Sequence, residues 1–239
     1  MIDIQVLPFE IDEDSEHLPA VGLVVLQTDE TMEHELRLWL PDSIRLFHSR
    51  IPNSVDISND SLQQMKQALP ASVALLPSTT PFRVIVYGCT SATTVIGEQA
   101  VSDAVRGVFP GVAVSNPLSA IKAQLDVLQV CRPALLTPYV PEVSRALIDA
   151  LQTPERQLVS VASFNESRDD RVARIARSSL MHSLDMLARD GRPDAIVASC
   201  TNLRTHGLIE EASQRLGIPV ISSNSALAWH VLQLLDMQG

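Results

Sequence analysis

Two cysteines occupy matching positions in this chain, in surroundings that suit a reactive thiol. Cys89 ends the aliphatic run of "VIVYGCTSATTVIG" (84–97), and Cys200 ends that of "AIVASCTNLRTHGL" (195–208). Each is followed by threonine, a small polar residue and a segment that favours a helix. A thiol at a helix start lies near the positive end of the helix dipole, which favours the thiolate. The repeated pattern predicts two nucleophilic or acid–base thiols.

The alternative is that both cysteines are structural, because free cysteine is among the most buried residue types. Their repetition in equivalent contexts favours chemistry. Cys131, in "VLQVCRPALL", has no polar turn after it and is expected to be structural. The three cysteines are an odd number and lack the spacing of a metal site, and a disulfide framework is not expected.

The polar residues that follow each cysteine are candidate substrate contacts. Thr90 and Ser91 follow Cys89, and Thr201 and Asn202 follow Cys200, where each pair could cap the next helix. Backbone N–H groups in the same turns could hold a carboxylate. Two histidines downstream of Cys200 would allow cysteine–histidine catalysis, although an ordinary packing role explains them more simply: His206 and His230.

Short aliphatic runs alternate with amphipathic segments along the chain, which predicts an α/β fold with parallel sheets. The expected strands are 21–26, 44–47, 83–87, 112–114, 134–137, 158–162, 196–198 and 220–221. The expected helices are 30–40, 61–69, 93–108, 118–130, 143–151, 168–177, 179–189, 208–216 and 226–235.

An internal repeat divides these elements into two similar halves. "VFPGVAVSNPLSAI" follows the first cysteine motif and "RLGIPVISSNSALA" follows the second, each with Ser-Asn after a short strand. We expect one α/β half over residues 1–117, completed by a C-terminal helix in 223–239, and a second half over 118–222. Each half would hold a four-stranded, mainly parallel sheet. Ligands of open α/β sheets bind at the carboxyl ends of strands, so the site is expected in the cleft between the halves.

Composition narrows the classes of partner. The net charge of −10 argues against binding to nucleic acid or to an anionic membrane, but not against a small anionic substrate. The chain has no glycine-rich phosphate loop and no metal-binding motif, so no cofactor and no metal are expected. It has no secretory signal and no apolar stretch of membrane-spanning length, which predicts a cytoplasmic protein.

The motifs at both cysteines resemble the aspartate/glutamate racemase superfamily, most closely its maleate cis–trans isomerase and arylmalonate decarboxylase branch. Amino-acid racemases of the superfamily typically have Cys-Asn-Thr and then Cys-Thr-His. Here Cys89-Thr90-Ser91 and Cys200-Thr201-Asn202 are closer to the maleate isomerase-like pattern, as are "TPYVPEV" (137–143) and "SSNSALAWH" (222–230). "LQTDET" (26–31) is similar to the maleate isomerase-like ectoine-utilisation subgroup.

This resemblance implies two Rossmann-like halves, a homodimer or larger oligomer, and chemistry without a cofactor. Cys89 would add to a substrate double bond, and Cys200 would donate and remove a proton from the other side. In racemases the same pair acts as two opposed bases. The resemblance also assigns substrate binding to Tyr139 and carboxylate binding to Asn165. Alternatively, Tyr139 makes a core hydrogen bond and Asn165 caps the next helix.

Asp29 departs from the maleate isomerase pattern, which has asparagine after the first strand. An asparagine amide can donate to a substrate carboxylate, whereas an ionised aspartate repels one. Asp29 would suit a substrate ammonium or amide N–H, and so an amino acid derivative. It could equally cap the helix expected from Glu30, and the two roles are compatible.

The sequence therefore predicts a cofactor-independent isomerase of a small carboxylic acid or amino acid derivative, with a place in ectoine catabolism. One alternative is a decarboxylase of the arylmalonate type, in which one cysteine protonates an enediolate; two cysteines weigh against it. The other is a non-catalytic protein that binds a metabolite in the same cleft.

Overall fold

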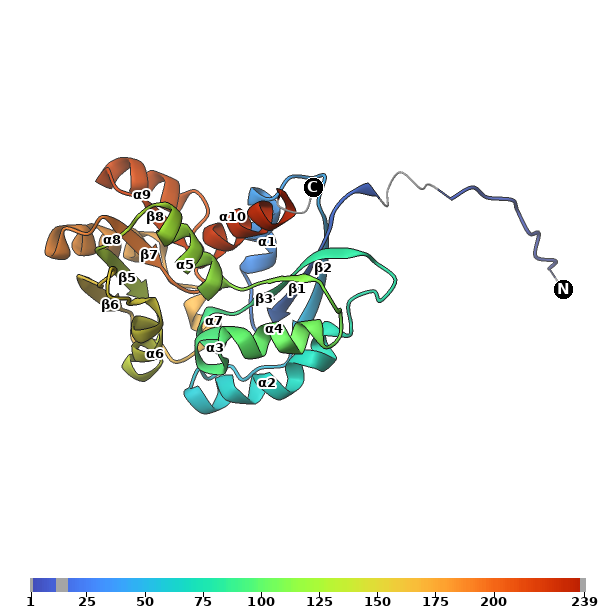
Figure 1. Ribbon diagram of the computed structural model, residues 1–239, viewed down its shortest axis with the longest axis horizontal. Helices are drawn as coiled ribbons and strands as arrows, with labels where there is room; N and C mark the ends of the chain where they lie inside the picture. The colour runs from blue at the N-terminus through green and yellow to red at the C-terminus, as the bar shows by residue number, and fades with distance from the viewer. Residues whose placement is uncertain (1, 12–16, 237–239) are drawn as a thin grey trace.

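The chain folds into two four-stranded parallel sheets flanked by helices, in a computed structural model that describes residues 2–11 and 17–236 (Figure 1). The first sheet has the order β2-β1-β3-β4 and the second the order β6-β5-β7-β8, so the two share one topology. Their strands are β1 (Ala20–Leu26), β2 (Arg45–Ile51), β3 (Phe82–Gly88), β4 (Ala113–Ser115), β5 (Pro133–Thr137), β6 (Ser160–Ser163), β7 (Ala195–Ala198) and β8 (Val220–Ser222). The predicted α/β class and all eight expected strands are confirmed.

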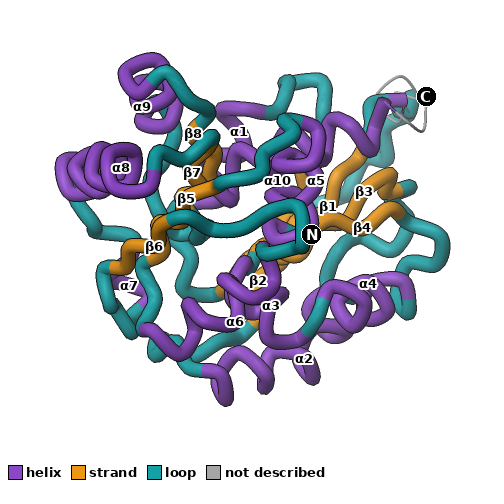
Figure 2. The backbone as a smooth tube through the Cα atoms, turned by 60° about the vertical axis from the view of Figure 1, so that its left-hand side comes forward, coloured by secondary structure: helices purple, strands orange, loops and turns teal. Residues whose placement is uncertain are grey.

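Helices cover both faces of each sheet (Figure 2). In the described part of the chain they are α1 (Met32–Trp39), α2 (Asn59–Val73), α3 (Thr90–Ile96), α4 (Glu98–Arg106), α5 (Pro117–Val127), α6 (Pro141–Leu151), α7 (Asp169–Val172), α8 (Arg177–Gly191), α9 (Leu208–Leu216) and α10 (Ser223–Asp236). None of these helices has the length and apolar character needed to cross a membrane.

Two expected helices are divided differently in the structure. The helix predicted over 93–108 is α3 followed by α4, because Gly97 between them has a φ of 93°, in the region that favours glycine. The helix predicted over 168–177 is only the short α7, and α8 begins at Arg177.

The central strands explain why so few aromatic residues are needed. Every residue of β1, β5 and β7 is buried, since helices cover both faces of a parallel sheet. The edge strand β6 instead alternates between half-buried and exposed side chains. Small and branched aliphatic residues fill the core, and aromatic residues make up only 4% of the chain.

The C-terminal helix α10 joins the halves. It packs against α5 and α1 and also contacts β3, β4 and β8, so it touches both sheets. In Figure 1 it lies between the two sheets, in red. Asn224 on α10 donates to Glu35 of α1 and to the carbonyl of Thr201 in the second half, each at 2.8 Å. The domain boundaries expected from the sequence remain a prediction: one domain over 1–117 with 223–239, and the other over 118–222.

Candidate active site

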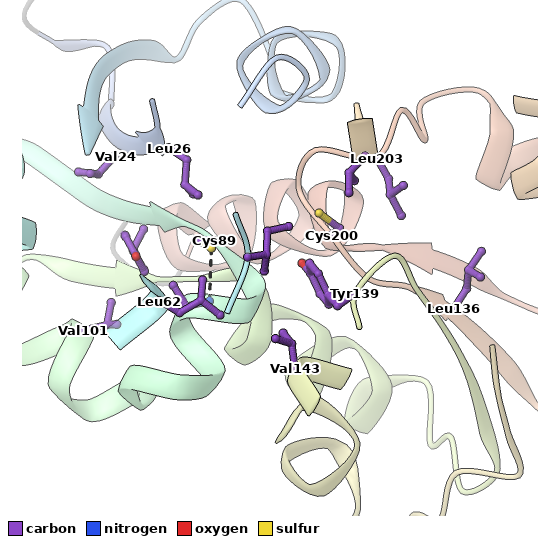
Figure 3. Packing of buried hydrophobic residues seen from close by; sticks show 14 of the residues in the cluster. Val24, Leu26, Leu62, Cys89, Val101, Leu136, Tyr139, Val143, Cys200 and Leu203 are labelled. Atoms are coloured by element: carbon purple, nitrogen blue, oxygen red, sulfur yellow. Dashed lines mark hydrogen bonds between the residues drawn. The ribbon is translucent and has the colours of Figure 1, made fainter. Parts of the chain in front are cut away.

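Cys89 lies at the junction between β3 and α3, where the sequence places it. It is the N-cap residue of α3, and the N–H of Ala92 donates to its Sγ at 3.3 Å (dashed line in Figure 3). The preceding Gly88 packs against α1, because a Cβ at that position would lie 2.5 Å from the Sδ of Met32. The local sequence thus sets the thiol at a strand end and at a true helix start.

Cys200 has the equivalent place after β7 but not the equivalent helix. Residues 199–207 form a loop, and α9 begins only at Leu208. The N–H of Asn202 donates to Sγ of Cys200 at 3.4 Å. The expectation that Thr201 or Asn202 caps a helix at this cysteine is therefore wrong, because an irregular loop contacting α1 and α7 takes the place of the first turn.

Both cysteines line one small pocket between the halves. Its free volume is about 20 Å³, which is room for about one water molecule. The residues that line it come from both halves: Leu26, Asp29, Asn53, Ser54, Asp56, Ile57, Ser61, Leu62, Met65, Cys89, Ser91, Tyr139, Asp169, Cys200 and Thr201. The predicted cleft is thus present but closed, so a substrate must open it to enter.

Burial keeps both thiols protonated in this closed state. Burial raises the pKa of Cys89 to about 12, although the N–H of Ala92 and the hydroxyl of Ser91 oppose the shift. Burial also raises the pKa of Cys200 well above its ordinary value, and the charge of Asp169 adds to that effect. The helix terminus at Cys89 favours the thiolate as expected, but loss of solvent outweighs it.

Tyr139 is buried beside both cysteines. Its hydroxyl lies against the Cys200 thiol, a contact that lowers the pKa of Cys200 against the effect of burial, and it also interacts with Ser91. Figure 3 shows the phenol oxygen pointing toward the space between the cysteines. The backbone of Tyr139 is fixed by Thr137, whose Oγ1 accepts its N–H at 3.2 Å, and by the hydroxyl of Ser144, which donates to its carbonyl.

Asp29 lines the pocket and also holds the start of α1. Its Oδ1 accepts the N–H groups of Thr31 at 2.9 Å and Met32 at 2.8 Å. Its Oδ2 is buried and has no hydrogen-bond partner in the described chain. Burial raises the pKa of Asp29 to about 7, while the two N–H donors and, less strongly, the hydroxyl of Thr201 oppose the shift. Oδ1 therefore orders the backbone, whereas Oδ2 lacks a hydrogen bond of normal geometry.

Asp169 is a pocket residue that the sequence reasoning missed. It begins α7, is only 5% exposed, and its Oδ2 accepts the hydroxyl of Thr28 at 2.5 Å. Its N–H donates to the carbonyl of Val55, so this segment of the second half contacts the first. Burial raises its pKa, opposed by the Thr28 hydroxyl. Only the polar run 165–170, which contains three acids, marks this region in the sequence.

Three predicted residues lie outside the pocket lining. The hydroxyl of Thr90 pairs with Ser223 at 2.8 Å. The amide of Asn202 accepts the N–H of Glu30 at 2.9 Å and donates to the carbonyl of Asp169, so it supports the pocket wall. Asn165 is exposed, has a φ of 53°, and does not cap α7, whose N-cap is Arg168. Thr201 does line the pocket, and its hydroxyl donates to the carbonyl of Gly88 at 3.4 Å.

The two histidines considered with Cys200 have other partners. His230 pairs through Nδ1 with the hydroxyl of Ser115 at 2.8 Å, and burial lowers its pKa. His206 packs its ring against Trp39, with centroids 5.1 Å apart. Neither lines the pocket. Within residues 2–11 and 17–236, no group of three or more histidine, cysteine or acidic side chains is placed to bind a metal ion.

The fold and the site define an α/β protein of two similar halves that presents one buried thiol from each half to a shared pocket. The sequence profile of arylmalonate decarboxylase matches residues 102–239. The chain belongs to the arylmalonate decarboxylase family.

Relatives of known activity extend the similarity over nearly the whole chain. The maleate isomerase of Nocardia farcinica is 26% identical over 230 residues, which cover 91% of this chain and 90% of that protein. A variant of the maleate isomerase of Pseudomonas putida S16, solved with maleate, superimposes with a TM-score of 0.83 at 21% identity, over 91% and 92% of the two chains. A mutant of the Nocardia farcinica enzyme, solved with a covalently bound succinylcysteine intermediate, gives a TM-score of 0.82 at 24% identity, over 91% and 93%.

Proposed function

We propose that this protein is a cofactor-independent isomerase of a small carboxylic acid or amino acid derivative, with Cys89 and Cys200 as its reacting pair. The observation that carries the proposal is that these two thiols, from equivalent strand ends, line the same closed pocket. Maleate isomerases that match nine-tenths of the chain support the reaction class.

For a cis–trans isomerisation, the sulfur of Cys89 bonds to one carbon of the double bond and Cys200 gives a proton to the other. Rotation about the resulting single bond follows. Cys200 then removes the proton, the double bond re-forms and the carbon–sulfur bond breaks, so both thiols are regenerated. Because burial holds Cys89 protonated at rest, its proton passes to a carboxylate of the pocket as the sulfur attacks, and it returns to the sulfur when the carbon–sulfur bond breaks. Tyr139, against Cys200, orients that thiol toward the reacting carbon.

For a racemisation, the same two thiols act from opposite faces of a Cα–H bond. One thiolate removes the proton while the other thiol supplies one, so the configuration inverts. The closed pocket suits both reactions, because the exclusion of water prevents solvent from protonating the carbanion intermediate. The similarity of residues 26–31 to ectoine-utilisation proteins supports a place in ectoine catabolism.

Two other functions follow from specific observations. The family's arylmalonate decarboxylases support a decarboxylase, in which a single cysteine protonates the enediolate left by carbon dioxide. Two thiols in one pocket favour the isomerase over it. A non-catalytic metabolite-binding protein would use the same pocket without reaction at either sulfur.

Proton NMR in D₂O distinguishes these functions. The panel holds maleate, aspartate, glutamate, 2,4-diaminobutyrate, its N-acetyl forms and phenylmalonate. Conversion of a vinyl signal supports cis–trans isomerisation, exchange of an α-proton supports racemisation, and loss of carbon dioxide supports the decarboxylase. Cys89→Ser and Cys200→Ser should each abolish turnover, while Cys131→Ser, at an exposed cysteine, should not. Turnover that survives both pocket substitutions would refute the proposed pair.

A further inference from the structure

The ionisable side chains that line the pocket, apart from its thiols and its tyrosine, are all acidic. Asp29, Asp56 and Asp169 contribute carboxyl groups, and none of the described residues that line the pocket is lysine, arginine or histidine. A substrate with two carboxylates would therefore meet like charge with no cation to balance it. Its neutral polar groups, the amide of Asn53 and several hydroxyls, can donate or accept but carry no charge.

The unpartnered oxygen of Asp29 marks where a donor is missing. Asp29 is 4% exposed and lines the pocket; its Oδ1 accepts two backbone N–H groups, and its Oδ2 is buried without a hydrogen bond of normal geometry. A buried acceptor left without a hydrogen bond is costly, so such groups in native proteins are nearly always paired. A ligand in the pocket that carries a hydrogen-bond donor would satisfy this oxygen.

Asp169 brings a second carboxyl group to the same pocket from the other half of the chain. It is fixed by the Thr28 hydroxyl at 2.5 Å and by its position at the start of α7. Arg50, on the adjoining strand β2, does not line the pocket. Its guanidinium donates to the carbonyls of Leu26 and Asp29 at 3.0 Å and pairs with Glu33 at 3.1 Å. Among the described residues that line the pocket, no cation therefore balances Asp29 and Asp169.

We infer that the substrate of the proposed isomerase carries a protonated amine, held by the carboxyl groups of Asp29 and Asp169 at the side of the pocket that adjoins the two thiols. An ammonium group has three donors and one positive charge, which matches two convergent carboxyl groups. The inference rests on the proposed function for the reaction, but it names the substrate class separately: a small amino acid or amino acid derivative rather than an unsaturated diacid.

The protonation state of Asp29 supports this and supplies a sharp test. Because its pKa is raised to about 7, the empty pocket keeps Asp29 largely protonated below that pH. Binding of an ammonium favours the ionised form and releases a proton, so affinity should rise with pH through 7. A bound carboxylate would instead need protonated Asp29 as a donor, and its affinity should fall. The other groups that face Asp29 are Asp169, Cys89, Cys200, Tyr139 and, through its main chain, Arg50.

Titration calorimetry on the full-length Cys89→Ser variant tests the inference without turnover. Four ligands of equal chain length are compared at pH 6 and pH 8: 2,4-diaminobutyrate, 2-aminobutyrate, butyrate and succinate. We expect at least one amine-bearing acid to bind tenfold or more tighter than the amine-free acids, more tightly at pH 8, with proton release. Asp29→Asn and Asp169→Asn should each remove this preference. Their matched controls are Glu30→Gln, at an exposed residue, and Asp170→Asn, at a half-exposed one; both lie outside the pocket and should not remove the preference.

Any of four results would overturn the inference. These are tighter binding of succinate or butyrate, an affinity for the amines that falls as the pH rises, no binding of either amine, and a preference for amines that survives Asp29→Asn. Its failure is separable from that of the proposed function. Amine-selective binding without turnover in the unsubstituted protein would retain the ligand class and reject the isomerase. Turnover of maleate together with tight succinate binding would retain the isomerase and reject the amine.

Discussion

The carboxylate of Glu35 on α1 accepts hydrogen bonds from both the N–H and the hydroxyl of Thr205, a residue of the opposite half, at 2.5 and 2.8 Å. The same carboxylate accepts the N–H of His206 and the side-chain amide of Asn224, each at 2.8 Å. Four donors thus converge on one buried acidic side chain. This cluster fixes the loop that follows Cys200 against the half that carries Cys89, and so sets how the two thiols face one another.

Glu35→Gln should destabilise the fold, because its amide would present a donor to groups that are themselves donors. We expect a loss of about 1–3 kcal/mol, the usual cost of leaving buried polar groups unsatisfied. Urea unfolding followed by circular dichroism measures it. Glu33→Gln, on the same helix but in a half-exposed ion pair with Arg50, should cost less than about 1 kcal/mol. Equal losses in the two variants would contradict a structural role for the cluster.

The stability of the free protein should depend on pH through Asp29. Its pKa is raised on folding to about 7, so the folded state binds a proton that the unfolded state has lost above pH 4. Stability from this group is therefore full below pH 4 and declines as the pH rises to 7, by on the order of 4 kcal/mol. Asp29→Asn should remove that decline. Thermal unfolding from pH 4 to pH 8 would contradict this if the two proteins changed in parallel.

The hydroxyl of Tyr139 should matter to the reaction more than to the fold. Tyr139→Phe removes the group that lies against Cys200, and loss of a hydrogen bond to a group that becomes charged costs about 1.5–3 kcal/mol, or roughly tenfold to a hundredfold in kcat. Tyr87→Phe is a matched control, since the hydroxyl of that buried phenol donates to the Sδ of Met65 at 4.0 Å and does not line the pocket. An equal loss of kcat in both variants would place the effect of Tyr139 in packing instead.

The three cysteines should differ in reactivity toward iodoacetamide. Cys131 is exposed, whereas Cys89 and Cys200 are buried with raised pKa values. Because the thiolate is the reactive form, we expect Cys131 to be alkylated at least tenfold faster than either pocket thiol in the free protein. Mass spectrometry of the peptides follows the order, and urea should abolish it. Faster labelling of Cys89 or Cys200 would show that the pocket opens readily and that a thiolate forms in it.

Much of the fold is local in origin, which is why the sequence alone determined it. Each central strand is a continuous aliphatic run, and strict alternation of strands with amphipathic helices admits only parallel sheets with crossover connections. The same locality placed Cys89 and Cys200 at strand ends. Tyr139 also follows directly from its strand, and it lines the pocket with both cysteines.

The tertiary structure decided what depends on contacts between distant segments. Asp169 reaches the pocket because α7 crosses to a residue 141 positions away, Thr28, and no local pattern records such a contact. Asn165 lies only four residues earlier but is exposed, since a loop has no periodicity from which orientation can be read. The protonation of the thiols was likewise set by their burial between the two halves. Desolvation depends on the whole surrounding structure, and at Cys89 its effect on the pKa outweighs that of the helix start visible in the sequence.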